Sequence, residues 1–551
     1  MEIKSNPSSK IDPKTGYCPE TQTFHSLRPI LDLPAETIPL SAASYALSLQ
    51  STLGFPANNT PALINSATGH RVSYPEFTFR VKALATSLQT SIGLSRNDAA
   101  FVLASTSTHI PVLYFALLSL RIVISPANPL SNQSEISRQI NLSKPTVAFA
   151  TSATSHKLPD LKHGTILIDT PEFESMMTNP SRELGPTVEA NVNQSDVAAI
   201  LYSSGTTGQV KGVMLTHRNL IAVVAGYYTQ GPQRSSPAVI LYTVPYFHVF
   251  GFFYSLKSVA LNETVVLLPG RFDLRNMLKA VEEFRVTHIA AAPPVVVAMA
   301  KGDVRNNEYD LSCLEAVGSG GAPLGEKVIK AFKHKFPRVI LSQGYGLTET
   351  TGAAFRVVGA EESLRLGSVG RLVGNCEAKI VDPETGVALP PGKQGELWMK
   401  GPITMKGYVD NPKATSEAFD LDGWVKTGDL CYFDSDGFLF VVDRLKELIK
   451  YKGYQVPPAE LEHLLQCHPD IAEAAVIPYP DEEAGQVPMA FVVKQPQSSL
   501  DEAQVIEYIA KQVAPYKKIR RVSFVSFIPK SAAGKILRKE LRKIALPESK
   551  L

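Results

Sequence analysis

The chain of 551 residues lacks most features that mark secreted, membrane or polyanion-binding proteins. Its five cysteines are far apart and form no Cys-x-x-Cys pair, which argues against a disulfide framework or a zinc site and favours a reducing compartment. No stretch approaches the roughly 20 apolar residues of a membrane span, and the polar N-terminus is unlike a signal peptide. The formal net charge of +3 is too small to indicate binding to nucleic acid.

The composition is otherwise that of a soluble enzyme. Apolar residues make up 44% of the chain and charged residues 19%, both ordinary values for a globular protein. One hydrophobic core does not grow to this chain length, so we expect at least two domains.

Short apolar runs alternate with amphipathic stretches through the first two-thirds of the chain. Helical spacing of apolar residues over 274–284 and 325–336 predicts two of the helices. The alternation of apolar runs with amphipathic stretches predicts an α/β fold with largely parallel sheets covered by helices. The runs that we expect to be strands are 146–150, 165–169, 197–202, 265–269 and 288–292.

The composition changes at 443–453, where an apolar strand over 438–442 meets a dense basic segment. We interpret this change as a hinge and predict two domains, 1–443 and 444–551. The second has the size of a small α+β domain. In it we expect helices over 458–466 and 501–513, and strands over 474–478, 489–493 and 522–527.

The densest motif is the run Ser-Ser-Gly-Thr-Thr-Gly-Gln-Val-Lys-Gly at 203–212. Its glycines let backbone N–H groups converge on an anion, its hydroxyls add donors, and Lys211 adds a positive charge. The run therefore predicts a phosphate cradle, although an ordinary polar turn is the alternative. It does not match the Walker A pattern, which disfavours the chemistry of P-loop NTPases.

Three further motifs could complete a nucleotide site. An aromatic ring, glycines, a hydroxyl and a carboxylate occur in 343–349, a carboxylate follows a tight turn in 424–429, and a lysine follows a glycine in 531–535. An aromatic ring can stack on adenine, one carboxylate can accept from ribose, another can hold Mg²⁺, and a lysine can offset charge on phosphate or carboxylate oxygens. Each motif alone could be a cap or a turn, but together they favour a nucleotide-dependent enzyme.

From about Thr23 to its C-terminus the chain resembles the acyl-adenylate-forming superfamily of acyl-CoA synthetases, firefly-type luciferases and peptide-synthetase adenylation domains. Within it the chain is most similar to plant 4-coumarate:CoA ligase-like proteins of the peroxisomal kind. The resemblance implies a large N-terminal domain of helix-covered sheets, a small mobile α+β lid, and two reaction steps. ATP and a carboxylic acid give acyl-AMP and diphosphate, and the thiol of coenzyme A then displaces AMP.

The resemblance also implies roles for residues that match the family's motifs. Thr348 would hold the α-phosphate, Glu349 would bind Mg²⁺, and Lys535 would orient the acid's carboxylate. His248 would gate or position the substrate rather than act as a general base. Gly320 to Ala322 would help to frame the adenine. The residues expected at ATP or AMP are Ser203, Ser204, Gly205, Thr206, Thr207, Lys211, Gln343, Gly344, Tyr345, Thr348, Asp429, Arg444, Lys446, Lys450 and Lys535.

Coenzyme A is expected at Arg271, Lys452 and Gly453. After the first step the lid would rotate near Lys446, which would bring Lys450, Lys452 and Gly453 toward the site and withdraw Lys535. One site would then serve both reactions.

The expected acid pocket departs from that of true hydroxycinnamate ligases. Phe250 and Phe253 stand where those enzymes have Tyr and Asn, Gly318 replaces a lysine, and Gly-Ala-Ala at 352–354 replaces Pro-Val-Leu. These changes predict a roomier, less polar pocket for an aromatic acid such as cinnamic or an extended arylpentadienoic acid, or for a fatty or oxylipin acid. The predicted lining is Val249, Phe250, Phe253, Gly318, Gly320, Gly321, Gly346, Gly352, Ala353 and Ala354.

Two other activities stay open from the sequence, a luciferase-like oxygenase and a ligase that loads a carrier protein. The final residues Ser549, Lys550 and Leu551 match the peroxisomal targeting tripeptide. We therefore expect a peroxisomal location and an import receptor as a partner.

Overall fold

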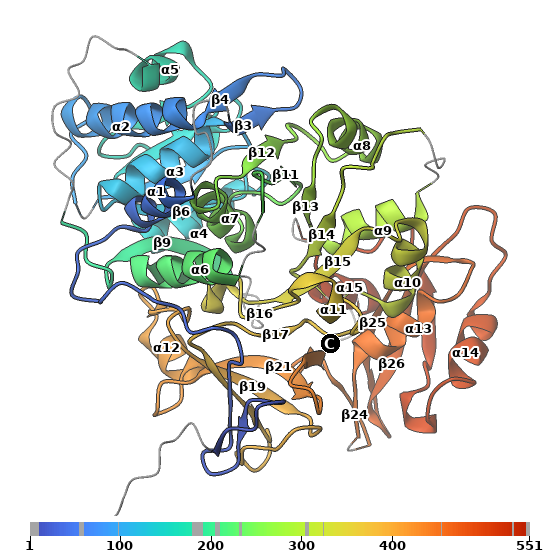
Figure 1. The fold of residues 1–551 in the computed structure, drawn as a ribbon. Helices are drawn as coiled ribbons and strands as arrows, with labels where there is room; N and C mark the ends of the chain where they lie inside the picture. Colours follow the sequence, from blue (N-terminus) through green and yellow to red (C-terminus); the bar gives the residue numbers. More distant parts are fainter. Residues whose placement is uncertain are drawn as a thin grey trace, which may run out of the picture.

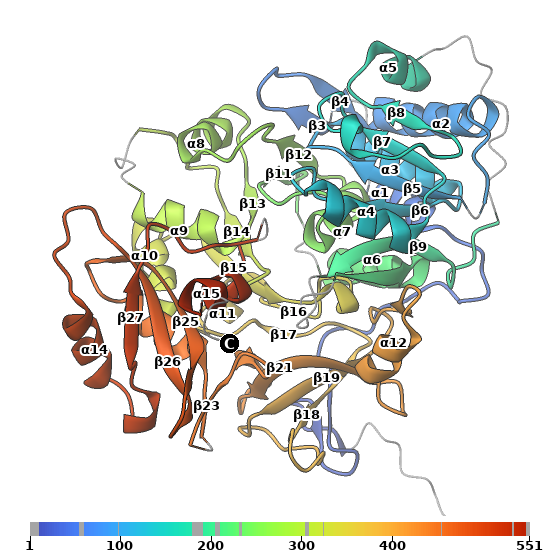
Figure 2. The same cartoon turned by 180° about the vertical axis from the view of Figure 1, so that it is seen from behind.

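The computed structural model describes residues 10–53, 60–96, 98–178, 191–203, 210–230, 234–302, 308–322, 324–452, 454–531 and 534–546. Within these ranges the strands form four sheets, three in a large N-terminal part and one in a small C-terminal part (Figures 1 and 2). The two parts match the predicted fold class. The predicted boundary between 443 and 444 stays a prediction.

The first sheet has seven strands and is parallel over its middle. Parallel pairs join β5 to β6 and β7, β6 to β9, and β7 to β8, whereas β10 pairs antiparallel with β9 and β20. In spatial order its strands are β20 (Gly407–Tyr408), β10 (Lys211–Thr216), β9 (Val197–Ser203), β6 (Val123–Pro126), β5 (Ala99–Leu103), β7 (Val147–Ala150) and β8 (Thr165–Leu167). Its neighbouring helices are α2 (Tyr74–Thr90), α3 (His109–Ser119), α4 (Gln133–Ser143) and α5 (Pro171–Thr178).

The second sheet has nine strands with a parallel centre and lies beside the acid pocket described below. In spatial order its strands are β17 (Arg371–Leu372), β16 (Phe355–Arg356), β15 (Ile340–Tyr345), β14 (Ala316–Ser319), β13 (His288–Ala291), β11 (Val239–Tyr242), β12 (Thr264–Leu267), β3 (Pro61–Asn65) and β4 (Arg71–Ser73).

Alternating side chains of this sheet enter two separate cores, as the two-residue period of a strand requires. Leu241, Ile289 and Val317 pack with helices α8, α9 and α10, whereas Ile240 and Tyr242 belong to the core that contains α7. The helices on the first face are α8 (Leu274–Glu283), α9 (Pro293–Lys301) and α10 (Glu326–Lys335). Those of the other core are α1 (Ala42–Thr52), α6 (His217–Gln230) and α7 (Val249–Ala260), with the short α11 (Gly359–Glu362) beyond β16.

The third sheet is antiparallel throughout, so the expectation of largely parallel sheets does not extend to it. Tight turns such as the one at 434–438 join successive strands here, whereas parallel strands need a long crossover. Its strands are β1 (Tyr17–Cys18), β2 (Thr23–His25), β18 (Glu377–Val381), β19 (Gly395–Lys400), β21 (Val425–Phe433) and β22 (Leu439–Arg444), with α12 (Pro412–Ala418) nearby.

The C-terminal part has its own sheet and its own buried core, as an α+β domain requires. It lies beside α9 and α10 in both views (Figures 1 and 2), and Lys327 of α10 donates to the carbonyl of Cys467 at 2.9 Å. Its strands are β23 (Ile449–Tyr451), β24 (Tyr454–Val456), β25 (Ile471–Asp481), β26 (Gly485–Lys494) and β27 (Arg521–Phe524). Its helices are α13 (Pro458–Leu465), α14 (Glu502–Ala510) and α15 (Arg538–Ala545).

The predicted strands and helices are present, with ends that differ by a few residues. The last predicted strand, 522–527, is shorter than expected. It ends at Phe524, and Phe527 beyond it is exposed. Helix α15 was not among the predicted elements. In the part of the chain that the structure describes, no helix is long and apolar enough to span a bilayer.

Candidate active site

The two ends of the predicted phosphate loop lie next to each other. Ser203, which ends β9, pairs with Lys211, which begins β10. The Ser203 hydroxyl donates to Oε1 of Glu349 at 3.0 Å, and Nζ of Lys211 lies 4.5 Å from the centre of the Tyr408 ring. The loop residues Ser204, Gly205, Thr206 and Thr207 are outside the described residues.

Glu349 faces this loop from a short 3₁₀ turn, Thr348–Thr350. Its Oε1 also accepts from the Tyr408 hydroxyl at 2.9 Å, and its backbone carbonyl accepts from the N–H of Met405 at 2.9 Å. Burial and the nearby carboxylate raise the pKa of Tyr408, so the phenol stays protonated and remains a donor. No hydrogen bond reaches Oε2 of Glu349 among the described residues, which leaves that oxygen available to a ligand.

Asp429, Arg444 and Tyr345 form a second cluster. Asp429 and Arg444 are paired across β21 and β22, with 3.3 Å between Oδ1 and Nε, and the Tyr345 hydroxyl donates to Oδ2 at 2.6 Å. Asp429 is 3% exposed. Burial raises its pKa although Arg444 and the Tyr345 hydrogen bond act to lower it, so desolvation outweighs the ion pair at this site.

Lys535 reaches the same cluster from the C-terminal part. Gly534 has φ of +79°, and a Cβ there would lie 2.8 Å from the ring of Pro294 at the start of α9, so the loop fits closely against the large domain only with glycine. Burial, followed by the charge of Arg444, lowers the pKa of Lys535 to about 8. Its Nζ makes no hydrogen bond or ion pair among the described residues, which leaves the amine free for a ligand.

The other lysines predicted at the site are not assembled in this arrangement. Lys446 and Lys450 are exposed, Lys452 is exposed and paired with Glu483, and Arg271 is exposed before α8. Gly453 is outside the described residues. Lys535 therefore lies close to the Asp429–Arg444 pair, whereas the side chains of Lys446, Lys450 and Lys452 are exposed; the lid rotation stays a prediction.

A channel of about 1050 Å³ lies along the nine-stranded sheet, and Gly344 and Gly346, the neighbours of Tyr345, belong to its wall. Gln343 and Gly344, which were assigned to the nucleotide, line its near end together with His248. The predicted acid-pocket residues that line the channel are Val249, Phe250, Phe253, Gly318, Gly320, Gly321, Gly346, Gly352 and Ala353. The assignment of Ala354 was wrong, because this residue is fully buried in the core and is absent from the channel wall.

Residue spacing explains why the channel is open. The wall from α7 includes Phe250, Phe253, Tyr254 and Lys257, which share one helical face. The opposite wall includes the small residues Ala316, Gly318 and Gly320, which alternate along β14 and the loop after it. A Cβ on Gly318 would lie in ordinary contact with the Tyr254 hydroxyl, at 3.9 Å, so a residue larger than alanine would fill the space between helix and sheet there.

His248 caps the start of α7. Its Nδ1 accepts from the backbone N–H of Phe250 at 3.3 Å, and burial lowers its pKa to about 4. A neutral imidazole that accepts at Nδ1 carries its proton on Nε2. His248 is therefore suited to donate a hydrogen bond at the channel entrance, which agrees with a positioning role rather than that of a base.

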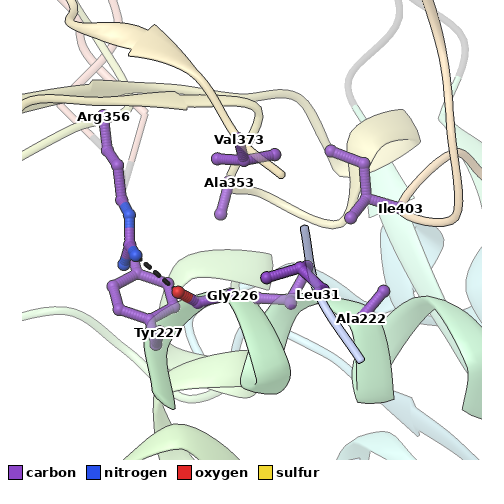
Figure 3. Close-up of a pocket in the computed structure, with 9 residues that line it drawn as sticks. Leu31, Ala222, Gly226, Tyr227, Ala353, Arg356, Val373 and Ile403 are labelled. Carbon is purple, nitrogen blue, oxygen red and sulfur yellow. Dashed lines mark hydrogen bonds between the residues drawn. The ribbon is translucent and has the colours of Figure 1, made fainter. Parts of the chain in front are cut away.

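Arg356 and Tyr227 lie in the channel wall and were not identified from the sequence. The guanidinium carbon of Arg356 is 4.0 Å from the centre of the Tyr227 ring, and Nη2 donates to the carbonyl of Gly226 at 2.6 Å (Figure 3). Both residues, with Ala353, also line a smaller apolar cavity of about 10 Å³ beside the channel. Ala353 thus forms part of the partition between the two spaces.

The channel contains further polar residues that were not predicted from the sequence, among them Lys257, Glu263, His288 and a second ion pair, Arg234 with Glu315. None of them belongs to a motif. The available signal was a lysine on the apolar helix Val249–Ala260, where a charged residue is out of place unless it has a buried partner.

Comparisons with known proteins agree with this geometry. Residues 54–409 match the AMP-binding enzyme family, and residues 460–535 match the AMP-binding enzyme C-terminal domain. The chain is 52% identical to 4-coumarate--CoA ligase-like 9 of Arabidopsis thaliana over 99% of both chains.

Two solved structures share the fold. ATP-bound MatB from Rhodopseudomonas palustris has a TM-score of 0.81 at 27% identity, covering 92% of this chain and 99% of that one. The o-succinylbenzoate CoA synthetase MenE from Bacillus subtilis, in complex with its acyl-adenylate intermediate OSB-AMP, has a TM-score of 0.76 at 26% identity, covering 90% and 97%. The chain therefore belongs to the AMP-binding enzyme family and is a ligase of the acyl-CoA synthetase type.

Proposed function

We propose that this protein activates an extended aromatic or medium-to-long aliphatic carboxylic acid with ATP and transfers the acyl group to coenzyme A. The observation that carries the proposal is the position of Lys535 close to Asp429 and Arg444. Tyr345, which donates to Asp429, stands between Gly344 and Gly346, and both glycines line a channel of about 1050 Å³. A free cation where a carboxylate would meet the α-phosphate, joined to a long apolar space, suits attack of a large acid on ATP.

In the first step the acid's carboxylate oxygen attacks the α-phosphorus, and diphosphate leaves. Lys535 and the phosphate loop neutralise the oxygens that gain charge, and Thr348 holds the α-phosphate. His248 donates from Nε2 to orient the carboxylate. The protein forms no covalent bond, so its contribution is position and charge.

Asp429 and Arg444 are proposed to bind the ribose. Their carboxylate and guanidinium are already aligned by each other and by Tyr345. Because both groups are held before the nucleotide arrives, little side-chain entropy is lost on binding.

Glu349 is proposed to bind Mg²⁺. One carboxylate with an open oxygen, next to a phosphate loop, fits the preference of this ion for one or two carboxylates plus substrate phosphates. Bound there, Mg²⁺ would supply charge neutralisation for the triphosphate.

Thioester formation is proposed to follow a lid rotation near Lys446, with coenzyme A bound near Arg271, Lys452 and Gly453. Lys452 and Arg271 are exposed and could meet phosphates of the cofactor. The thiol then attacks the acyl carbon, and AMP leaves.

The size of the channel supports a longer acid than 4-coumarate. At Phe250, Phe253 and Gly318 its walls are aromatic or lack a side chain, so these three positions offer no side-chain hydrogen bond to a phenolic hydroxyl. Each additional buried methylene, in contrast, stabilises binding by roughly 0.8 kcal/mol.

The activity is tested by measuring whether the three products form in equal amounts. Purified protein with ATP, Mg²⁺, coenzyme A and a panel of cinnamic, arylpentadienoic and C6 to C16 acids should release AMP, diphosphate and acyl-CoA in equal amounts. AMP release that needs a carrier protein, or that consumes O₂ with emission of light, would overturn the proposal in favour of one of the two other activities.

Peroxisomal location is proposed from Ser549, Lys550 and Leu551 alone, which are outside the described residues. An N-terminally tagged protein without these three residues should stay in the cytosol, whereas the full chain should enter peroxisomes. Import of both forms would contradict the proposal.

A further inference from the structure

Two segments, one at each end of the C-terminal part, carry pairs of charged residues three positions apart and meet beside the nucleotide cluster. Arg444 ends β22, and Glu447 lies in the turn after it, where its N–H donates to the carbonyl of Arg444 at 2.9 Å. Lys535 lies in the loop before α15, and Arg538 is the first residue of that helix. An ion pair joins the two segments, with 2.9 Å between Nη1 of Arg538 and Oε2 of Glu447.

Arg538 is fixed by more than this ion pair. Its side chain is 10% exposed, and each of its three nitrogens has a partner. Nη2 donates to Oε1 of Glu462 at 2.6 Å, and Nε donates to the carbonyl of Val476 at 3.1 Å. A planar guanidinium with three such contacts has little freedom to rotate, so it also holds the carboxylate of Glu447 in place.

The loop that carries Lys535 is fixed to the same helix. The N–H of Lys535 donates to Oγ of Ser531 at 3.2 Å, and its carbonyl accepts from the N–H of Ser531 at 2.8 Å. The N–H of Leu537 donates to the carbonyl of Pro529 at 2.9 Å. Lys535 is thus held at a set place relative to Arg538 and to the carboxylate that Arg538 binds.

The charges around Lys535 act in opposite directions. Burial and then the charge of Arg444 lower the pKa of Lys535, Glu447 and Asp429 raise it, and Arg538 lowers it. Asp429 is already paired with Arg444, whereas Glu447 approaches Lys535 without an ion pair between them in the part of the chain that the structure describes. The charged groups that act on Glu447 itself are Arg444, Lys535, Arg538, Asp443 and Glu462.

A role in the fold alone explains Glu462 better than Glu447. Glu462 is 6% exposed and also accepts from the N–H of Val476 at 2.8 Å, so it joins α13 to β25. Glu447 is half-buried on a turn, and among the described residues no backbone N–H donates to its carboxylate. Its one ion pair places a negative charge near Lys535 and contributes little to the core of the domain.

We propose that Glu447 is a positioning residue for acyl-AMP formation: Arg538 fixes its carboxylate, and this carboxylate holds Lys535 as an ammonium ion at the site. The inference deepens the proposed function and rests on it. Glu447 and Arg538 both follow the hinge expected near Lys446, so they would move together with Lys535 when the lid rotates. Loss of Glu447 should therefore slow acyl-AMP formation and leave thioester formation from supplied acyl-AMP near wild type.

The test measures kcat/KM for AMP release against pH in Glu447→Gln, with an acid that the wild-type protein activates. The glutamine oxygen can still accept from Arg538, so the fold is kept while the negative charge is lost. The midpoint of the decline expected at about pH 8 should move down by about one pH unit. At pH 8.5 kcat/KM should then be about eightfold below wild type, and at pH 6.5 within about a factor of two. Glu447→Asp keeps the charge and should return the midpoint toward the wild-type value.

The matched control is Glu462→Gln, which removes the other carboxylate bound to Arg538. It should lower the free energy of unfolding and leave the midpoint unchanged. Burial raises the pKa of Glu462 to about 7, so this variant also shows whether Glu462 contributes to the pH profile. Glu507→Gln removes an exposed carboxylate that pairs with Lys511 on α14, and it should change neither quantity.

An unchanged midpoint in Glu447→Gln, an equal shift in Glu462→Gln, or equal losses in the two half-reactions of Glu447→Gln overturns this inference and leaves the proposed ligase activity intact. Absence of AMP release by the wild-type protein with every acid overturns the proposed function itself. The two failures are therefore distinguishable.

Discussion

The two ends of the channel differ in how their charges are held. At the nucleotide end, Asp429 is fixed by Arg444 and Tyr345, and the neighbouring Lys535 has no partner among the described residues. At the far end, Lys257 and Glu263 pair with each other in the channel wall. The first arrangement suits a reaction that develops charge, whereas the second neutralises its own charges. The comparison suggests that chemistry and choice of acid depend on separate residues and can be changed independently.

The largest expected effect separates the two half-reactions. Lys535→Ala should slow acyl-AMP formation about a hundredfold, since removing one positioned charge at such a centre costs about 3 kcal/mol. Thioester formation from supplied acyl-AMP should change little, because the proposed lid rotation would withdraw this lysine in that step. Single-turnover assays of each half-reaction measure both rates.

The control for this variant is Lys530→Ala, a lysine of the same domain that pairs with Glu473 away from the site. It should leave both half-reactions near wild type. Equal losses in the two half-reactions of Lys535→Ala would contradict the alternating lid.

The next prediction concerns the middle of the channel. Gly318→Leu should lower kcat/KM for undecanoic acid at least tenfold more than for hexanoic acid, because its side chain points at Tyr254 and crosses the path to Lys257. Gly318→Ala adds a Cβ with only ordinary contacts and should have a small effect. A Leu variant that slows both acids equally would show that long acids do not pass this residue.

A third prediction distinguishes two adjacent alanines. Ala354→Leu should overpack the core and lower the free energy of unfolding by about 1 to 3 kcal/mol without changing the preference among acids. Ala353→Val should alter that preference, because Ala353 lines the channel. Thermal or urea unfolding, together with kcat/KM for hexanoic and undecanoic acids, checks both outcomes. A changed acid preference in the Ala354 variant would show that this residue does line the acid pocket.

The smallest expected effect is a pH dependence. The pKa of Lys535 is lowered to about 8, and its proposed role in adenylation depends on the protonated form. The value of kcat/KM should therefore be highest below pH 7 to 8 and decline as the pH rises through about 8, since this parameter reports the free enzyme. His248, with a pKa lowered to about 4, should add no change between pH 5 and 7. Lys535→Arg should shift the decline to higher pH, and an unshifted decline would assign it to another group.

The sequence predicted the nucleotide end far better than the channel. Residues such as Lys211, Glu349 and Asp429 occur in short motifs whose chemistry is readable from residue type and spacing. Lys257 and His288 come from separate elements, α7 and β13, and meet only after the sheet forms. Ala354 shows the same limit, because a run of small residues does not tell which side chain points into the pocket and which into the core.

The antiparallel third sheet and helix α15 were missed for related reasons. The strands of this sheet do not alternate regularly with helices, which is the pattern that made the parallel sheets predictable. Helix α15 is short, strongly charged and has one fully buried residue, Leu541, so its periodic signal is weak.

The central claim is that a long acid is activated at the nucleotide end while its chain occupies the channel. The most direct test measures kcat/KM for AMP release, dependent on coenzyme A, with 4-coumaric acid and with acids of ten or more carbons along their length. We expect a higher kcat/KM for at least one long acid, with one acyl-CoA formed for each AMP. A preference for 4-coumaric acid over every longer acid would contradict it.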